Sequence, residues 1–220
     1  MLVDAEVTIP GNGVHLQADI GVPVDARGIV VFAHGSGSSR KSPRNREVAA
    51  ALQRAQFATL LLDLLTLDEE RVDELTRQMR FDIPFLADRL AAATVWVQQE
   101  SSLSTLPIGY FGASTGAAAA LIAGAQRGDD VRAIVSRGGR PDLAGQALDM
   151  VRAPTLLIVG GDDETVLELN RDALAKLRCV KSLEIVPHAT HLFEEPGAMA
   201  QVIDLATAWF IQHLVHPAHR

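Results

Sequence analysis

One serine in the sequence has the surroundings of a nucleophile. The segment GASTG at 112–116 fits the G-x-S-x-G pattern and lies between an apolar strand predicted over 108–111 and an Ala-rich helix predicted over 115–127. An abrupt strand-to-helix turn exposes the Ser114 hydroxyl, and the helix N-terminus behind it favours negative charge on a bound acyl oxygen. The alternative is that Ser114 only caps the helix. The flanking strand and helix favour a nucleophile.

A serine hydroxyl is a poor nucleophile at neutral pH and needs a neighbouring base. His188 and His191 both follow the last predicted strand, at the sheet edge where α/β proteins bind ligands. Position in the loop favours His191 only slightly. Three further histidines lie in or beyond the final predicted helix, where we expect no catalytic role: His213, His216 and His219.

The carboxylate that orients the base is expected after the strand predicted over 155–159. That strand ends in GGDDE at 160–164, so three acids compete for the role. Acids at the start of a helix often serve as caps, which Asp162 or Glu164 could do. Spacing does not separate Asp162 from Asp163.

Two backbone amides should hold the oxyanion that forms during acyl transfer. One belongs to Thr115, the residue after the nucleophile, and the other to the loop HGSGSS at 34–39, where Ser36 is the candidate. The alternatives for this loop are a generic glycine-rich turn or a phosphate-binding loop. It lacks the Gly-Lys-Ser/Thr ending of the latter and the full G-x-G-x-x-G pattern.

Several arginines and lysines lie near these loops. Arg40, Lys41, Arg44 and Arg46 form either a solvated helix face, which we favour, or a patch that attracts anionic substrates. Arg137 follows another strand and is a candidate for binding an acidic group of the substrate. No Cys, His or carboxylate spacing is typical of a metal site, so we expect neither metal nor cofactor.

The elements that position these residues alternate as in an α/β fold. A hairpin is predicted first, turning at 10–13, and buried parallel strands then alternate with amphipathic helices. The strands are predicted over 29–33, 58–62, 108–111, 131–135, 155–159 and 183–186. The helices are predicted over 44–55, 69–99, 115–127, 164–178 and 197–215, with a small one near 142–147.

The segment 63–82 is longer than a simple connection, and its apolar residues form a stripe that faces either the cleft or, as we favour, the core. These apolar residues are Leu64, Leu67, Val72, Leu75 and Met79. The connection between 135 and 155 leaves no room for a large lid domain.

Composition sets the outer limits. A chain of 220 residues without a composition shift predicts one domain over 1–220. A net charge of −7 excludes a basic nucleic-acid-binding surface. The lone Cys179 fits a reducing cytoplasm, and we expect no signal peptide and no membrane contact. No apolar stretch is expected to reach bilayer-spanning length, the longest candidate being 117–123.

With these residues in place, the chain resembles the dienelactone hydrolase-like branch of the α/β-hydrolases. The motifs that carry the resemblance run in order along nearly the whole chain after the hairpin: HGSGSSRKSPRN at 34–45, GASTG at 112–116, GGDDETV at 160–166 and HATHLFEEPG at 188–197.

The resemblance implies a Ser114 nucleophile, an Asp163 acid, a His191 base and oxyanion amides from Ser36 and Thr115. True dienelactone hydrolases use a cysteine nucleophile, so Ser114 favours a general short-acyl carboxylesterase. A perhydrolase or acyltransferase with the same triad is the alternative, and a binding module without chemistry is a third. We expect a small-molecule ester as substrate and a monomer or homodimer.

Overall fold

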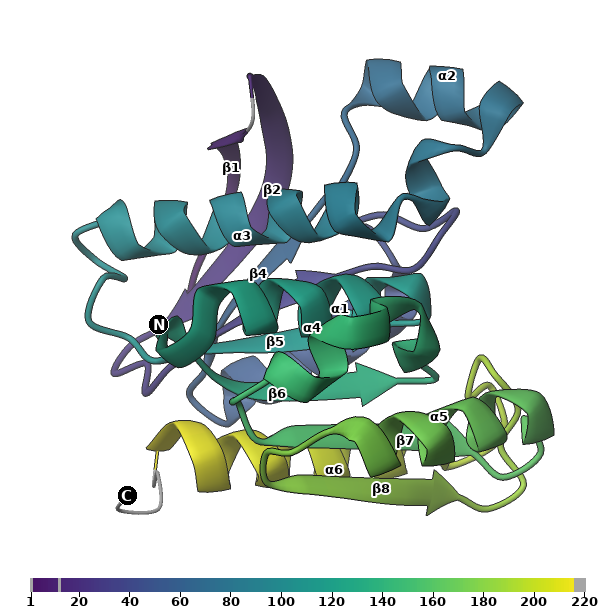
Figure 1. Ribbon diagram of the computed structural model, residues 1–220. Coiled ribbons are helices and arrows are strands. Elements are labelled where there is room, and N and C mark those ends of the chain that lie inside the picture. Colours follow the sequence, from purple (N-terminus) through teal and green to yellow (C-terminus); the bar gives the residue numbers. More distant parts are fainter. Residues whose placement is uncertain (1, 12, 216–220) are drawn as a thin grey trace.

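The computed structural model describes residues 2–11 and 13–215, which contain one eight-stranded sheet in the order β1-β2-β4-β3-β5-β6-β7-β8 (Figure 1). The β1–β2 hairpin and the β2–β4 pair are antiparallel, and every other neighbouring pair is parallel. The strands are β1 Leu2–Gly11, β2 Val14–Pro23, β3 Ile29–Ala33, β4 Ala58–Leu62, β5 Ile108–Ala113, β6 Val131–Arg137, β7 Thr155–Gly160 and β8 Lys181–Val186.

Helices cover both faces of this sheet. The cluster of buried side chains on one face includes residues of α3, α4 and α5, and the cluster on the other face includes residues of α1 and α6 (Figure 1). The α-helices are α1 Pro43–Arg54, α2 Leu67–Thr76, α3 Ile83–Gln99, α4 Thr115–Arg127, α5 Glu164–Lys176 and α6 Ala198–Phe210. Shorter helical turns are η1 Met79–Phe81, η2 Gly128–Asp130, η3 Pro141–Met150 and η4 Ile211–Val215.

This architecture confirms the predicted α/β-hydrolase fold, with its antiparallel hairpin, its mostly parallel sheet and its helices on both faces. Between β6 and β7 only η3 intervenes, so the described connection holds no large lid domain. The carboxyl ends of the parallel strands all meet at one edge of the sheet, which lies on the right in Figure 1. Loops from that edge carry the predicted site residues.

One predicted helix is wrong. The segment 69–99 is not continuous, because Arg77 adopts a left-handed φ of 54° that ends α2. A new helix, α3, then starts where the Asp82 side chain accepts a hydrogen bond from the Phe85 amide (3.1 Å), with Pro84 in its first turn. The apolar periodicity continues across the break and hides it in the sequence.

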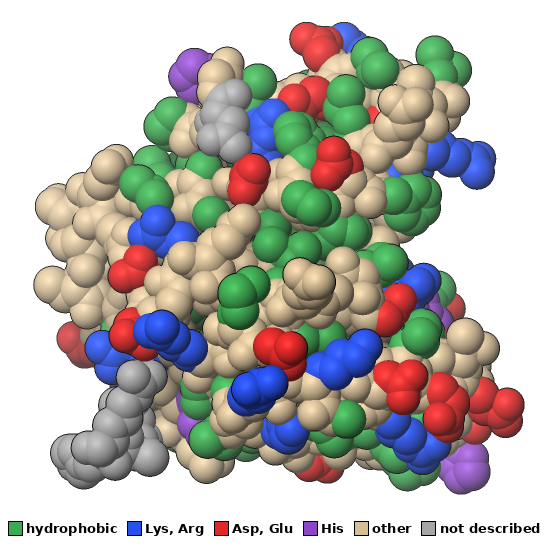
Figure 2. Space-filling view, in the orientation of Figure 1, with side chains coloured by type: hydrophobic (Ala, Val, Ile, Leu, Met, Phe, Trp, Pro, Cys, Tyr) green, Lys and Arg blue, Asp and Glu red, His purple; other side chains and the backbone are tan. Residues whose placement is uncertain are grey.

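The expectation that the stripe in 63–82 faces the core is also wrong in part. Leu64 is buried and Met79 packs against the core, but Leu67, Val72 and Leu75 are exposed. They lie on α2, which projects from the body above the carboxyl edge of the sheet (Figure 1). Figure 2 shows the surface notched below this projection.

The expectation that no apolar stretch is long enough to span a bilayer needs correction. Residues Ala198–Val215, which comprise α6 and η4, form an 18-residue helix of mean hydropathy 1.2. By length and composition alone it passes the test for a membrane span. Of this window 39% is buried, including Val202, Ala206 and Phe210 in the cluster that the helix shares with α1.

A polar pair is enclosed in the core between the sheet and α3. Tyr110 of β5 is fully buried, and its hydroxyl is hydrogen-bonded to the equally buried hydroxyl of Thr94. Thr94 donates in turn to the Leu90 carbonyl (3.2 Å), so the Tyr110 hydroxyl is the donor within the pair. Burial raises the pKa of Tyr110 above its ordinary range, which keeps the phenol neutral.

This pair predicts an asymmetric response to mutation. Thr94→Val should lower the free energy of unfolding by roughly 1–3 kcal/mol, because it leaves the Tyr110 hydroxyl buried without an acceptor. Tyr110→Phe should cost only about 1 kcal/mol, since Thr94 keeps Leu90 as its acceptor. Urea unfolding measures both. The double variant should be more stable than Thr94→Val alone, and the opposite order would contradict this account.

Candidate active site

Ser114 occupies a strained turn between β5 and α4. Its backbone has φ 51° and ψ −121°, a conformation that non-glycine residues rarely adopt. Glycines on both sides make the turn possible: a Cβ at Gly116 would lie 2.3 Å from the Ala33 carbonyl oxygen, and one at Gly112 would lie 2.4 Å from the Ala117 Cα. The Ser114 side chain makes no capping hydrogen bond to α4, so the structure does not support the alternative role of a helix cap.

Backbone hydrogen bonds hold this turn against its strain. The Ser114 amide donates to the Arg137 carbonyl (3.2 Å), and the Ser114 carbonyl accepts from the amides of Arg140 (3.1 Å) and Ala117 (3.1 Å). The loop after β6 therefore fixes the Ser114 backbone through hydrogen bonds with Arg137 and Arg140. Strain of this kind persists only where surrounding contacts determine the backbone, as they do here.

Asp163 and His191 meet directly at the same sheet edge. The Nδ1 atom of His191 lies 2.7 Å from the Asp163 Oδ2 atom, although 28 residues separate the two in sequence. Asp163 stands at the N-terminus of α5 but does not cap it, because its side chain bonds to the histidine. A proton held on Nδ1 leaves Nε2 free to accept one.

The geometry also distinguishes the residues that spacing left open. Asp162 is exposed, and its backbone amide donates to the Ala189 carbonyl (3.0 Å). His188 is exposed as well, at the first left-handed position of its loop, with φ 60°. Of the two candidate aspartates and the two candidate histidines, Asp163 and His191 are the pair joined by a hydrogen bond.

Two further contacts shape the histidine loop. Thr190 donates its hydroxyl to Glu195 (2.5 Å), and Glu194 forms an ion pair with Arg44 of α1 (2.9 Å). Phe193 packs into the core on the face that includes α1 and α6. The loop is thus anchored on both sides of His191.

Ser114 and His191 both border the loop after β6. The Arg137 carbonyl accepts a hydrogen bond from the Ser114 amide. A Cβ placed on the next residue, Gly138, would lie 3.6 Å from His191 Nδ1. No hydrogen bond joins the Ser114 and His191 side chains in the described residues. Such bonds are often long in an enzyme without substrate and tighten in the complex.

The predicted oxyanion residues are in contact. The Ser36 amide donates to the Thr115 hydroxyl (2.9 Å), and the Thr115 amide lies at the start of α4, where it has no intrahelical acceptor. A Cβ at Gly35 would approach the Ser114 Cβ to 3.0 Å, so this loop runs directly beside the serine.

A buried histidine that sequence reasoning did not single out supports the oxyanion loop. The Nε2 atom of His34 accepts a hydrogen bond from the Leu64 amide (3.1 Å), so the ring proton is on Nδ1. Nδ1 donates in turn to the Gly35 carbonyl (2.9 Å). This ring ties the loop after β3 to the loop after β4. Its place directly after a buried strand and before Gly35 was the available sign of such a role.

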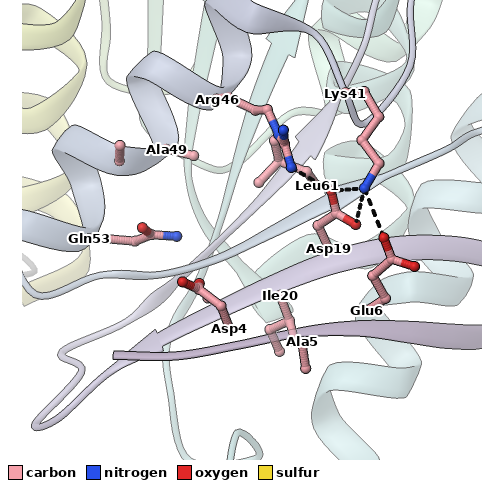
Figure 3. Close-up of a pocket in the computed structure, with 12 residues that line it drawn as sticks. Asp4, Ala5, Glu6, Asp19, Ile20, Lys41, Arg46, Ala49, Gln53 and Leu61 are labelled. Atoms are coloured by element: carbon pink, nitrogen blue, oxygen red, sulfur yellow. Dashed lines mark hydrogen bonds and ion pairs between the residues drawn. The ribbon is translucent and has the colours of Figure 1, made fainter. Parts of the chain in front are cut away.

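The basic residues after this loop are paired within the molecule. Asp19 accepts hydrogen bonds from Arg40 (3.0 Å), Lys41 (2.9 Å) and Arg46 (3.3 Å), and Figure 3 shows the last two converging on it. Arg40 also forms an ion pair with Asp63. The cavity of about 390 Å³ beside this network is lined by charges of both signs together with apolar side chains; the charged residues are Asp4, Glu6, Asp19, Lys41 and Arg46. Lys41 and Arg46 are exposed, as a solvated face requires, whereas Arg40 and Arg44 are partly buried and paired with carboxylates.

The remaining candidates divide into three groups. Arg137 is 7% exposed at the end of β6. His213 is buried, and its ring lies 4.3 Å from that of Trp209 at a tilt of 54°, while His216 and His219 lie outside the described residues. Within residues 2–11 and 13–215, no three His, Cys, Asp or Glu side chains gather closely enough to hold a metal ion.

Fold and site together define an α/β-hydrolase. A dienelactone hydrolase from Anabaena variabilis shares 54% sequence identity with the chain at a TM-score of 0.95, covering 97% of this chain and 99% of that one. The chain belongs to the dienelactone hydrolase-like family of α/β-hydrolases. Est1E from Butyrivibrio proteoclasticus has the same fold, with a TM-score of 0.78 at 15% identity over 94% of this chain and 98% of its own.

A longer relative carries a different name. A Mycobacterium tuberculosis (strain H37Rv) protein called "Putative phosphoribosyl transferase" is 56% identical over 216 residues, which cover 98% of this chain and 48% of that protein. The chain thus spans about half the length of this relative. No family model matches the chain.

The buried His34 predicts sensitivity to acid. Burial lowers the pKa of His34 below its ordinary value of 6.5, so the native state keeps the ring neutral while the unfolded state takes up a proton. The free energy of unfolding should therefore fall as the pH drops below 6.5, by up to about 1.4 kcal/mol per pH unit.

His34→Gln is the matched variant, because its amide can still accept from Leu64 and donate to Gly35 without titrating. Urea unfolding of both proteins between pH 7 and pH 5 should show a smaller slope in the variant. His213, whose pKa burial also lowers, is present in both proteins and cancels in the comparison. Equal slopes would show that His34 does not cause the effect.

Proposed function

We propose that the chain hydrolyses carboxylic esters through an acyl-enzyme formed on Ser114. The observation that carries the proposal is the 2.7 Å contact between Asp163 and His191, at the sheet edge where Ser114 is held in a strained turn. A serine, an imidazole and a carboxylate from three separate loops form the set that nucleophilic acyl transfer requires. The names of similar solved structures, a dienelactone hydrolase and a carboxyl esterase, support the same class of reaction.

The proposed reaction has two steps. His191 Nε2 takes the proton of the Ser114 hydroxyl while the serine oxygen bonds to the ester carbonyl carbon, and the imidazolium then gives that proton to the leaving alcohol. In the second step His191 removes a proton from water as the water oxygen bonds to the acyl carbon. The bond from that carbon to the Ser114 oxygen then breaks, the imidazolium returns its proton to the serine oxygen, and the acid is released. Asp163 keeps the Nδ1 proton in place and stabilises the imidazolium in both steps.

The amides of Ser36 and Thr115 are proposed to hold the oxyanion. Without substrate the Ser36 amide donates to the Thr115 hydroxyl, so an incoming oxyanion must share or replace that acceptor. The Thr115 amide, at the N-terminus of α4, adds the favourable end of a helix dipole. We propose short acyl groups as substrates, since the β6–β7 connection holds only η3 and supplies no large apolar lid.

Ser114→Ala tests the nucleophile. The variant should fold, because alanine is smaller than serine in the same turn, and kcat/KM for p-nitrophenyl acetate should fall at least about a thousandfold. A fluorophosphonate probe should label the wild type and Ser102→Ala, an exposed serine outside the site, but not Ser114→Ala. Near-normal turnover by Ser114→Ala would overturn the assignment. A series of p-nitrophenyl esters of increasing acyl length measures the size of the acyl pocket.

The two histidines of the loop provide a second test. His191→Ala should lose activity to the level of Ser114→Ala, whereas His188→Ala should stay within a few-fold of wild type, because the His188 side chain is exposed and Asp163 bonds to His191. Steady-state kinetics on both variants decide the point. A dominant loss in His188→Ala would transfer the role of base to that residue.

The same triad could pass the acyl group to peroxide or an alcohol. Product partition between water and each added nucleophile distinguishes these reactions. Acid as the overwhelming product supports hydrolysis, and predominant transfer to the added nucleophile identifies a perhydrolase or acyltransferase.

A further inference from the structure

Arg137 is a buried cation without a counter-ion. Its residue is 7% exposed, its Nε atom is enclosed without a hydrogen-bond acceptor, and no carboxylate in the described part of the chain pairs with it. Arg89, which is buried to a similar degree, shows the usual arrangement, since its guanidinium pairs with Glu69 at 2.7 Å. Buried charges in proteins are normally paired, so the exception at Arg137 requires an explanation.

The charge persists at neutral pH. Burial, together with the nearby cation of Arg44, lowers the pKa of Arg137 to about 10, which still leaves the guanidinium protonated. An unpaired buried charge is costly, and an anion would recover part of that cost. Electrostatics therefore favour an anion at this position over a neutral group.

Two further features add positive potential around Arg137. Side chains alternate along β6, so Arg137 points to the same face as Val135, the face that α1 and α6 cover. Arg44 lies in the first turn of α1, and its own Nε atom is enclosed without an acceptor although Nη1 pairs with Glu194. The first turn of the 12-residue α1, which holds Arg44, also carries the positive end of the helix dipole.

The Arg137 guanidinium also packs over an aromatic ring, that of Phe193. The Arg137 Cζ atom lies 5.9 Å from the centre of the Phe193 ring, which is itself 2% exposed. A planar, preoriented guanidinium fork is suited to bidentate contact with a carboxylate or phosphate. This contrasts with the paired network around Asp19, where each cation already has its anion.

We propose that Arg137, assisted by Arg44 and the N-terminus of α1, binds a small oxyanion, either a carboxylate or a phosphate. The oxyanion belongs to an acidic group on the ester substrate or is free in solution. The substrate source rests on the proposed ester hydrolysis, whereas anion binding itself does not.

The position of this site couples it to both halves of the candidate active site. The Arg137 carbonyl accepts the Ser114 amide (3.2 Å), and Phe193 is two residues from His191. An anion that orders Arg137 and Phe193 would therefore act on the serine turn and on the histidine loop together.

Binding is measured on the full chain carrying Ser114→Ala, which removes turnover from the experiment. Inorganic phosphate and succinate, added at constant ionic strength, should raise the Tm of this protein in a saturable manner. The shift should disappear when Arg137→Met is added and persist when Arg132→Met is added, since Arg132 is an exposed arginine on the same strand. Isothermal titration with both ligands gives Kd values for the same proteins.

Kinetics on proteins that retain Ser114 identify the source of the oxyanion. The ratio of kcat/KM for mono-(p-nitrophenyl) succinate to that for p-nitrophenyl acetate should fall at least tenfold in Arg137→Met and stay unchanged in Arg132→Met. A fall in this ratio supports a substrate acid group. Anion binding that Arg137→Met abolishes without any change in the ratio supports a free anion.

Two results would overturn the proposal: no saturable anion effect together with no charge preference in the wild type, or an effect that Arg137→Met leaves intact. If Arg137→Met does not fold, Arg137→Lys keeps the charge without the fork and should weaken binding while retaining part of it. Failure of ester hydrolysis itself would remove the kinetic comparison but leave the Tm and titration results decisive.

Discussion

The turn at Ser114 is the constraint on which the rest of the site depends. The strained backbone of Ser114, with φ 51°, is possible for two reasons. Gly116 has no side chain to clash with the neighbouring carbonyls, and the loop after β6 holds the serine backbone by hydrogen bonds. The same loop borders His191. One irregular segment after β6 therefore sets the position of the serine relative to the histidine.

The loops that carry the candidate catalytic residues are held in place by polar contacts between other residues. His34, buried and neutral, joins the oxyanion loop to the loop after β4. Asp19 accepts hydrogen bonds from three cations of the segment 40–46, which follows the oxyanion loop, and Arg44 pairs with Glu194 in the histidine loop. Loops have few apolar contacts of their own, so charge pairs and buried hydrogen bonds supply the rigidity that an active site needs.

Charge neutralisation distinguishes structural basic residues from a candidate ligand site. The cations around Asp19 are satisfied within the chain, whereas Arg137 is buried without a carboxylate in the described residues. Sequence alone ranked the group at 40–46 and Arg137 similarly, as basic residues near loops. The difference arises because Asp19 lies 21–27 residues from the cations that it pairs with, a separation that no local pattern contains.

The sequence by itself determined the alternation of strands and helices, the G-x-S-x-G turn and the two loops that carry the acid and the base, because hydrophobic period and turn chemistry are local properties. It did not determine the break at Arg77, the exposure of Leu75 or the choice of Asp163 over Asp162 on residue spacing alone. Those outcomes depend on which side chains come into contact once the sheet and its helices have packed together. Only the tertiary structure brings His191 within 2.7 Å of one aspartate and leaves the other exposed.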